Sequence, residues 1–402
     1  MGTIVFLGSP AFGHVNPTLP LAQELVQRGE QIIYYNHEEF RRPIEQTGSM
    51  FYAYPETEIS ATSIGAALRG GNLANLGSLL LAATENLLPY LLDHLPRHRP
   101  DLIIFDSMAL WGKMVATLLN LRAASSISHF VYDPSHLMSE GAHSMRYLWQ
   151  ILPQLPSVFI MRSRLIRKYR RAFPKERPLL PLRGSLNLVF TLRALQPKTT
   201  LIDETFRFVG PSINPQIRSD AFFLPTERKS PIVYISLGTI HTRQMEFYQR
   251  CFAAFGDYPA QFILSTGNGT AIEKLGAIPS NFIVRSTVPQ LKVLEQTNIF
   301  ITHGGMNSIH EGLYYGVPLI LVPYQLEQRL NARIIVKQGA GLLVERAAGE
   351  PPSIDNLRRA LDAIFSDPRY QKAARRLQQL FQETGGYQQA ADEVQSYYMQ
   401  RG

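Results

Sequence analysis

Short apolar runs that alternate with helical segments constrain this chain more than any other feature. Residues 3–7 form a short apolar run, which is typical of a strand buried on both faces. Residues 17–28 carry apolar side chains at helical spacing, and Gly29 supplies a stop. Residues 31–36 then predict a second strand. A strand, a helix and a strand at this spacing form a βαβ unit, so we expect a parallel sheet with right-handed crossovers.

The same alternation begins again in the second half of the chain. Strands are predicted at 102–105, 123–130 and 187–190, and then at 232–235, 261–264, 282–284, 299–302 and 319–322. Between the two series, residues 208–230 contain three prolines and scattered charge, as an interdomain linker does. A chain of 402 residues is also too long for one ordinary core. We therefore predict an α/β protein with domains at 1–207 and 231–384.

Composition favours a globular protein without a membrane span. Hydrophobic residues make up 45% of the chain and charged residues 18%. The first residues show no basic leader and only a short apolar run, so no signal peptide is predicted. The most apolar later stretch, 76–95, is interrupted by Glu85, Pro89 and Asp93. The single cysteine, Cys251, suits a reducing compartment and core packing, so we expect a cytoplasmic location.

Positive charge is concentrated in one stretch. The formal net charge is +8, and residues 162–177 contain eight basic residues and one acid, Glu176. A solvated basic helix would account for this pattern. The alternative is attraction to an anionic membrane or an acidic partner. A nucleic-acid partner is not expected, because no recognised binding motif accompanies the charge.

Two polar residues lie where predicted strands of the first domain end. His14 is in the loop after the first strand, and Asp106 directly follows the strand at 102–105. In parallel sheets, ligands bind outside the carboxyl ends of the strands. The loop lacks the G-x-G-x-x-G spacing of a dinucleotide fingerprint, and no acidic residue ends the second strand, so a nicotinamide enzyme is not favoured.

The stretch 287–332 has the pattern of a phosphate-binding site. A strand at 299–302 is followed by His303, Gly304 and Gly305, and a helix then begins near Asn307. Paired glycines permit positive φ and a close approach of the backbone to a ligand. The N-terminus of a helix binds phosphate through unsatisfied N–H groups and the helix dipole. A second turn of this kind, 236–239, ends in Thr239.

This stretch resembles the donor-binding signature of the family 1 UDP-dependent glycosyltransferases, in the form carried by bacterial macrolide-type enzymes. The matching residues keep an unbroken spacing, whereas a Gly-Gly turn alone would be weak evidence. They are Pro289, Gln290, Leu294, Thr302, His303, Gly304, Gly305, Asn307, Ser308, Glu311, Gly316, Val317, Pro318, Pro323, Glu327 and Gln328.

The resemblance implies a GT-B fold, in which two Rossmann-like parallel-sheet domains face a cleft. The first domain, 1–207, would bind the acceptor and carry the catalytic base. The second, 231–384, would bind the nucleotide-sugar donor, and a helix within 385–402 would cross back to the first domain.

The resemblance also implies roles for individual donor-binding residues. His303, Asn307, Ser308 and Thr239 would hold the pyrophosphate at the Gly304-Gly305 turn. Gln290 and the Val288 backbone would bind uracil, and Glu311 the ribose hydroxyls. Glu327 and Gln328 would bind the sugar, although both could instead simply begin a helix. Plant members carry tryptophan where this chain has Thr287, so the choice of nucleotide is left open.

His14 matches the catalytic histidine of these enzymes, and the segment 105–112 resembles the one whose aspartate hydrogen-bonds it. An imidazole is a suitable base for an acceptor hydroxyl near neutral pH. A buried carboxylate, here Asp106, would fix its tautomer and stabilise the imidazolium. No D-x-D motif and no metal-ligand spacing occur, so neither a metal nor a cofactor is expected.

The sequence thus predicts an inverting glycosyltransferase. A sugar, with glucose expected, would move from a UDP-sugar to a hydroxyl of a lipophilic small molecule such as a macrolide, phenolic or flavonoid. Three alternatives remain open. They are a non-catalytic sugar-nucleotide-binding protein, a UDP-sugar epimerase on the same fold, and a serine hydrolase, against which the missing G-x-S-x-G elbow weighs. The oligomeric state cannot be predicted.

Overall fold

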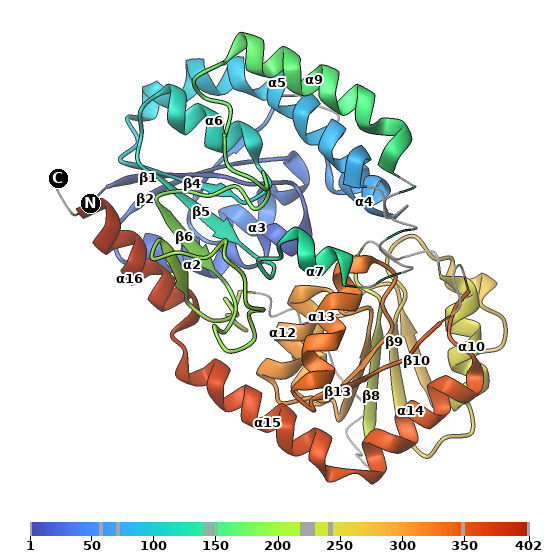
Figure 1. Cartoon of the computed structure of the whole chain (residues 1–402). Coiled ribbons are helices and arrows are strands. Elements are labelled where there is room, and N and C mark those ends of the chain that lie inside the picture. The colour runs from blue at the N-terminus through green and yellow to red at the C-terminus, as the bar shows by residue number, and fades with distance from the viewer. Residues whose placement is uncertain are drawn as a thin grey trace. The chain divides into compact units, whose positions relative to one another are not determined.

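The computed structural model describes residues 2–55, 59–69, 73–139, 141, 145, 149, 151–217, 230–239, 244–346 and 350–399. The chain divides into two compact units (Figure 1). The first unit contains Met1–Ile213 and Thr384–Gly402, and the second contains Asn214–Glu383. Each unit is built around one parallel sheet with helices packed against it, so the predicted Rossmann-like architecture of both halves is confirmed.

The first unit has a seven-stranded sheet in the order β3-β2-β1-β4-β5-β6-β7. All its strands are parallel, and β1 and β4 pair in register up to Leu7 and Phe105. The strand order changes direction between β1 and β4. The strands are β1 (Thr3–Leu7), β2 (Gln31–Asn36), β3 (Met50–Ala53), β4 (Leu102–Asp106), β5 (Ala123–Ile127), β6 (Leu186–Val189) and β7 (Phe206–Phe208).

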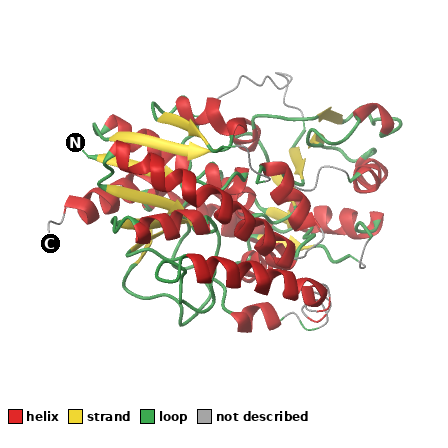
Figure 2. Ribbon diagram, turned by 90° about the horizontal axis from the view of Figure 1, so that it is seen from above, coloured by secondary structure: helices red, strands yellow, loops and turns green. Residues whose placement is uncertain are grey.

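Helices cover both faces of this sheet (Figures 1 and 2). The layer formed by α5, α6 and α9 lies on one face, and α2 and α16 lie on the other (Figure 1). Among the described residues, no helix is long and apolar enough to cross a membrane. The helices are α1 (Phe12–Val15), α2 (Thr18–Gln27), α3 (Arg41–Glu45), α4 (Ala61–Arg69), α5 (Leu73–His98), α6 (Leu110–Leu118), α7 (Pro134–Met138), α9 (Leu155–Lys168) and α16 (Gly386–Met399).

The second unit has a six-stranded parallel sheet in the order β10-β9-β8-β11-β12-β13. Here the strand order changes direction between β8 and β11. The strands are β8 (Ile232–Ser236), β9 (Gln261–Ser265), β10 (Phe282–Arg285), β11 (Ile299–Thr302), β12 (Leu319–Leu321) and β13 (Gly341–Leu343). The helices are α10 (Met245–Phe255), α11 (Gln290–Leu294), α12 (Met306–Tyr314), α13 (Leu326–Lys337), α14 (Ile354–Ser366) and α15 (Pro368–Glu383).

The last helix, α16, returns to the first unit and packs on α2. Arg28, at the end of α2, donates from Nη1 to Asp392 Oδ1 at 2.5 Å. The buried carboxylate of Glu30 accepts from Gln395 Nε2 at 2.7 Å and from the Gly2 amide at 2.6 Å. Tyr398 also donates to Glu30. These bonds join the two ends of the chain within one unit.

The end of the first domain differs from the sequence prediction. The linker was predicted from residue 208, but β7 pairs with β6 and residues up to Ile213 belong to the first unit. The three residues of β7 are too short to produce a pattern in the sequence. Residues 218–229 of the predicted linker lie outside the described residues. Cys251 is fully buried in the second core, as expected.

Candidate catalytic and donor-binding sites

The candidate residues of both units lie at the point where the strand order changes direction. In the first unit, His14 lies in α1, which follows β1, and Asp106 is the last residue of β4. In the second, the turns after β8 and β11 carry Thr239 and His303. The two loops at such a point diverge to opposite sides of the sheet, and this leaves the crevice where ligands bind in open parallel sheets.

The segment that carries His14 is held at both ends by buried side chains. The Tyr54 hydroxyl donates to the Gly8 carbonyl at 3.0 Å, before the single turn of α1. After it, Thr18 Oγ1 donates to the Val15 carbonyl at 2.7 Å. His14 therefore occupies a defined position within α1.

His14 and Asp106 form a short hydrogen bond. His14 Nδ1 lies 2.7 Å from Asp106 Oδ2, and their side chains are 16% and 3% exposed. The Met108 amide donates to the other carboxylate oxygen at 2.9 Å. Burial alone would raise the pKa of Asp106, but the charge and hydrogen bond of His14 and the Met108 amide together lower it. With a proton on Nδ1, Nε2 is the basic nitrogen of the His14 ring.

Two neighbours of this pair were missed by sequence reasoning. Ser128 Oγ lies 3.4 Å from His14 Nδ1, and the rings of His14 and His129 are 6.2 Å apart. Ser107 Oγ lies 3.2 Å from His129 Nε2. Ser128 and His129 directly follow β5, which pairs with β4. The sequence pattern predicts this strand to run to residue 130, so the position of both residues beyond its end at Ile127 could not be read from the pattern.

In the second unit, the His303 imidazole is enclosed by two glycines. A Cβ atom at Gly238 would lie 2.6 Å from His303 Cε1, and one at Gly305 would lie 2.3 Å from Nε2. Gly238 and Gly304 also have positive φ, of 71° and 82°. Because Thr302 pairs with Ser236, the turns after β8 and β11 lie beside each other. Only glycine leaves room for the ring between them.

The His303 turn leads directly into α12. Gly305 is the N-cap, so no side chain caps the first amides, and Asn307 and Ser308 lie in the first turn. Burial lowers the pKa of His303 to about 4, so its ring is neutral at pH 7 and acts as a neutral hydrogen-bond donor. Thr239, on the neighbouring turn, is exposed. Backbone N–H groups and neutral donors at a helix N-terminus suit an anionic ligand.

Gln290, Glu311 and Tyr234 form one hydrogen-bonded chain. Gln290 Nε2 donates to Glu311 Oε2 at 2.6 Å, and the Tyr234 hydroxyl donates to Gln290 Oε1 at 3.1 Å. Tyr234 stacks on Phe300 and is buried. The residues predicted to bind uracil and ribose are thus in direct contact. Val288, half-buried, comes just before α11.

Glu327 and Gln328 lie in the first turn of α13. Gln328 Oε1 accepts from the amides of Tyr324 at 2.9 Å and Gln325 at 3.2 Å, within a capping box. Glu327 is exposed. The Gln328 amide oxygen therefore caps the start of α13, which is the alternative role that the sequence predicts for this residue.

Asn331 on α13 was missed by the sequence analysis. It is fully buried, and its Nδ2 donates to the Gly304 carbonyl at 3.1 Å. It follows Gln328 by one helical turn, which places both on the face of α13 toward the glycine turn. This spacing was the available signal.

Within the described ranges, no group of three or more His, Cys, Asp or Glu side chains is arranged to hold a metal ion. The absence of a metal requirement stays a prediction.

Comparisons with known proteins give a consistent result. The family described as "UDP-glucoronosyl and UDP-glucosyl transferase" matches residues 219–385. NDP-glycosyltransferase YjiC of Bacillus subtilis (strain 168) is 32% identical over 405 residues, covering 98% of this chain and 97% of that protein. Oleandomycin glycosyltransferase of Streptomyces antibioticus is 29% identical, covering 98% of this chain and 90% of that protein.

Solved structures with the same fold include two glycosyltransferases. The glycotransferase of kitacinnamycin superposes with a TM-score of 0.84 at 26% identity, covering 98% of each chain. CalG4, the calicheamicin glycosyltransferase, gives 0.80 at 24% identity, covering 100% of this chain and 99% of its own. The fold is therefore GT-B.

Proposed function

Because the chain belongs to the UDP-glycosyltransferase family, we propose that it moves glucose from UDP-glucose to a hydroxyl of a lipophilic small molecule, with inversion at the anomeric carbon. The observation that carries this proposal is the 2.7 Å bond between His14 Nδ1 and Asp106 Oδ2 at the carboxyl edge of the first sheet. A sugar-nucleotide-binding protein without catalysis would have no need of an oriented base.

His14 acts as the general base in this proposal. Nε2 takes the proton from the acceptor hydroxyl as its oxygen forms a bond to the anomeric carbon. The bond from that carbon to the UDP oxygen breaks on the opposite side, which inverts the configuration. Asp106 keeps the proton on Nδ1 and stabilises the imidazolium that forms. General-base action of this kind contributes about 10²–10⁴ in rate.

The leaving UDP is stabilised by residues of the second unit. The first amides of α12, the neutral His303 ring and the side chains of Thr239, Asn307 and Ser308 bind the diphosphate, at the turn of Gly304 and Gly305. A helix N-terminus supplies about 0.3–1 kcal/mol when exposed and up to about 2 kcal/mol when partly buried. Since one helix supplies so little, several donors must act together. We propose no metal ion for this step.

The remaining donor residues bind the nucleoside and the sugar. Gln290 and the Val288 backbone contact uracil, and Glu311 contacts the ribose hydroxyls. The bond between Gln290 and Glu311 supports this assignment, because it brings the base and ribose subsites together. Glu327 and Gln328 contact the sugar, with Gln328 acting from its position in the capping box.

The names of relatives support a natural-product acceptor. One relative is an oleandomycin glycosyltransferase, and another, 26% identical, is named demethyllactenocin mycarosyltransferase. We propose acceptors of comparable character, namely macrolides, phenolics or flavonoids. The word "glucosyl" in the family description supports glucose as the transferred sugar.

The decisive experiment measures UDP release and product mass from UDP-glucose with a panel of phenolic and macrolide acceptors. Wild type should give a product heavier by one hexose, and His14→Ala should lose this activity by about 10²-fold or more. His94→Ala, a substitution on α5 of the same unit, serves as the control and should retain it. Equal turnover by wild type and His14→Ala would refute the role of His14.

The alternatives give different results in the same assay. An epimerase would convert UDP-glucose when no acceptor is present. A serine hydrolase would be labelled by a covalent serine probe, which should leave this protein unmodified. A binding protein would retain UDP but give no product with any acceptor.

A further inference from the structure

The helix α9 has an apolar inner face and an outer face of unusual composition. Leu165 is buried against the core of the first unit, and Val158, Met161 and Ile166 are partly buried there. Phe159 and Ile160, by contrast, are 57% and 62% exposed. A contiguous patch of exposed, large apolar side chains is a mark of an interaction site.

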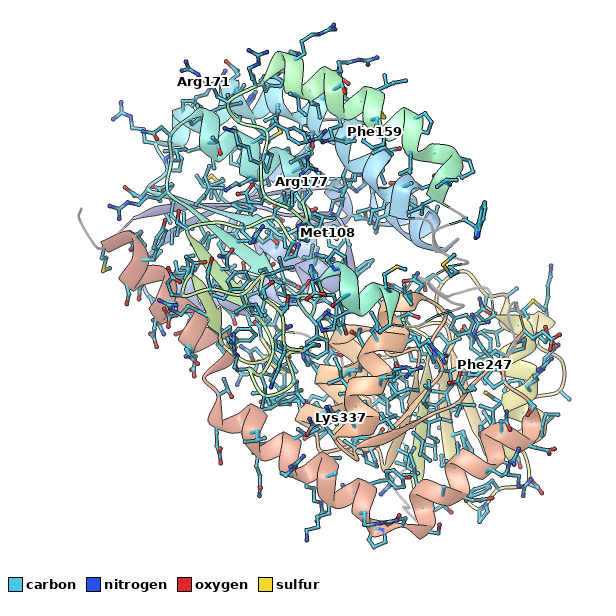
Figure 3. The ribbon with its side chains drawn as sticks, viewed as in Figure 1. Met108, Phe159, Arg171, Arg177, Phe247 and Lys337 are labelled. Atoms are coloured by element: carbon cyan, nitrogen blue, oxygen red, sulfur yellow. The ribbon has the colours of Figure 1, made fainter. Side chains whose placement is uncertain are left out.

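The second half of the same outer face is basic. Arg167 and Lys168 are exposed in the last turn of α9, and the chain beyond it adds Arg170, Arg171, Lys175 and Arg177, all exposed. Figure 3 labels Phe159 on α9 and Arg171 near the end of this helix, both in the outer layer of the unit, and Arg177 on the loop that follows.

Few of these charges are neutralised. Of the eight basic residues at 162–177, Arg164 alone has an acidic partner in the part of the chain that the structure describes, Glu85 at 3.6 Å. The one acid of the segment, Glu176, pairs instead with Lys113 at 3.8 Å. The positive charge of this surface is therefore directed outward and available to a ligand of opposite sign.

We propose that this surface docks the protein on an anionic lipid bilayer. It comprises Leu152, Phe159, Ile160, Arg164, Arg167, Lys168, Arg170, Arg171, Lys175 and Arg177, and we call it the α9 surface. Phe159 and Ile160 insert among the lipid headgroups, while the cations contact the phosphates. Apolar and cationic side chains on one helix are the pattern of interfacial binding.

Other occupants fit these observations less well. A nucleic acid would neutralise the cations but would leave Ile160 and Leu152, which is 55% exposed, in contact with a charged backbone. A second copy of this chain would place like charges against each other, because the same basic surface would face itself. An anionic bilayer complements both the charge and the apolar side chains.

Vesicle sedimentation tests the proposal with the full chain and no sugar nucleotide, so the outcome does not depend on the catalytic assignment. The protein should sediment with vesicles of phosphatidylglycerol and phosphatidylcholine but not with phosphatidylcholine alone. Arg167→Glu/Arg171→Glu should weaken binding by about 25-fold or more, because each cation near the surface contributes about fivefold. Phe159→Ser/Ile160→Ser should also weaken binding to the anionic vesicles, although this variant has the same net charge as wild type.

Lys198→Glu/Lys372→Glu is the matched control, since it changes the net charge equally at exposed sites elsewhere. It should bind vesicles like wild type, and all variants should keep the wild-type melting temperature. Equal loss in the control would show attraction by net charge alone and overturn the proposal. Failure of wild type to sediment with anionic vesicles would also overturn the proposal. So would the finding that wild type is a dimer in solution and that the Phe159→Ser/Ile160→Ser variant is a monomer.

Discussion

The buried side chain of His303 makes the free energy of unfolding depend on pH. Burial lowers its pKa from 6.5 to about 4, and burial lowers the pKa of His310, on the helix α12 that follows the turn, to about 3. Below pH 6.5 the unfolded chain therefore binds protons that the folded chain excludes. The free energy of unfolding must fall as pH falls through this interval.

We expect each of these histidines to contribute about 1.4 kcal/mol of lost stability per pH unit between pH 6.5 and its folded pKa. The His303→Gln variant removes one of the two contributions, so its stability should depend less steeply on pH between 6.5 and 4.5. Urea unfolding at three pH values in that range measures the slopes. Identical slopes for wild type and variant would contradict a neutral, buried His303.

Asp106→Asn tests the carboxylate beside His14. The amide can still contact the ring but cannot stabilise the imidazolium, so the turnover number should fall by about 10²–10⁴. UDP affinity should stay unchanged, because the proposed donor residues belong to the other unit. Initial rates and calorimetric titration with UDP separate the two effects. A turnover number within about twofold of wild type would remove Asp106 from the mechanism.

The ionised carboxylate of Asp106 also contributes to the free energy of unfolding, and this contribution depends on pH in the acid range. Its folded pKa lies below the ordinary value, so the unfolded chain binds a proton first as pH falls. The stabilisation is present above pH 4 and is lost as pH drops through the folded pKa. Asp106→Asn should lack this contribution.

At the residue scale, sequence reasoning could find His14 and Asp106 because each directly follows a recognisable strand or occupies the loop after one. Asn331 and His129 could not be identified as site residues from the sequence in this way. Their significance depends on which backbone carbonyl or ring they meet in the folded chain. The capping role of Gln328 is predicted only as an alternative, because a glutamine at a helix start can bind either the backbone amides of its own helix or a ligand.

At the scale of elements, the two turns beside β8 and β11 depend on glycine. Gly305→Ala would place a Cβ atom 2.3 Å from His303 Nε2 and force the ring out of position. We expect a loss of stability of about 1–3 kcal/mol, as for other overpacked sites, together with at least tenfold weaker UDP binding. Thermal unfolding and calorimetry measure the two effects.

Gly77→Ala is the control for this prediction. Gly77 lies within α5, and a Cβ atom there would meet nothing within 4 Å. Alanine should stabilise the helix by about 0.5–1 kcal/mol and leave UDP binding unchanged. If Gly305→Ala also left stability and UDP binding undiminished, the enclosure of His303 by glycines would not be needed for UDP binding.

Most strands could be predicted from the sequence, and the strands that could not be predicted share a position. Strands with four or more consecutive apolar residues, such as β1, β4 and β8, gave clear patterns. The missed strands β3, β7 and β13 lie at the edges of their sheets. They are three or four residues long, and they form because a neighbouring strand offers hydrogen bonds. Pairing of that kind leaves little trace in a local pattern.

At the scale of the whole molecule, catalytic and donor residues are assigned to separate units. A ligand held by the second unit should therefore stabilise that unit selectively. At a UDP concentration of 100 times Kd, the expected stabilisation is about 2.7 kcal/mol. Hydrogen exchange should slow in β8, β11 and α12 and change little in β1 and β4. Equal protection in both sheets would show that the nucleotide also binds the first unit.

The return of α16 to the first unit has a consequence for the engineering of this protein. The first unit is discontinuous in the chain, since it resumes at Thr384 after the whole of the second. A chimera that exchanges the second unit for that of a relative therefore needs two crossovers, near Ile213 and near Thr384. A single crossover would import a foreign last helix, whose partners for Arg28 and Glu30 would have to match by chance. During synthesis, too, the face of α2 stays uncovered until α16 has left the ribosome.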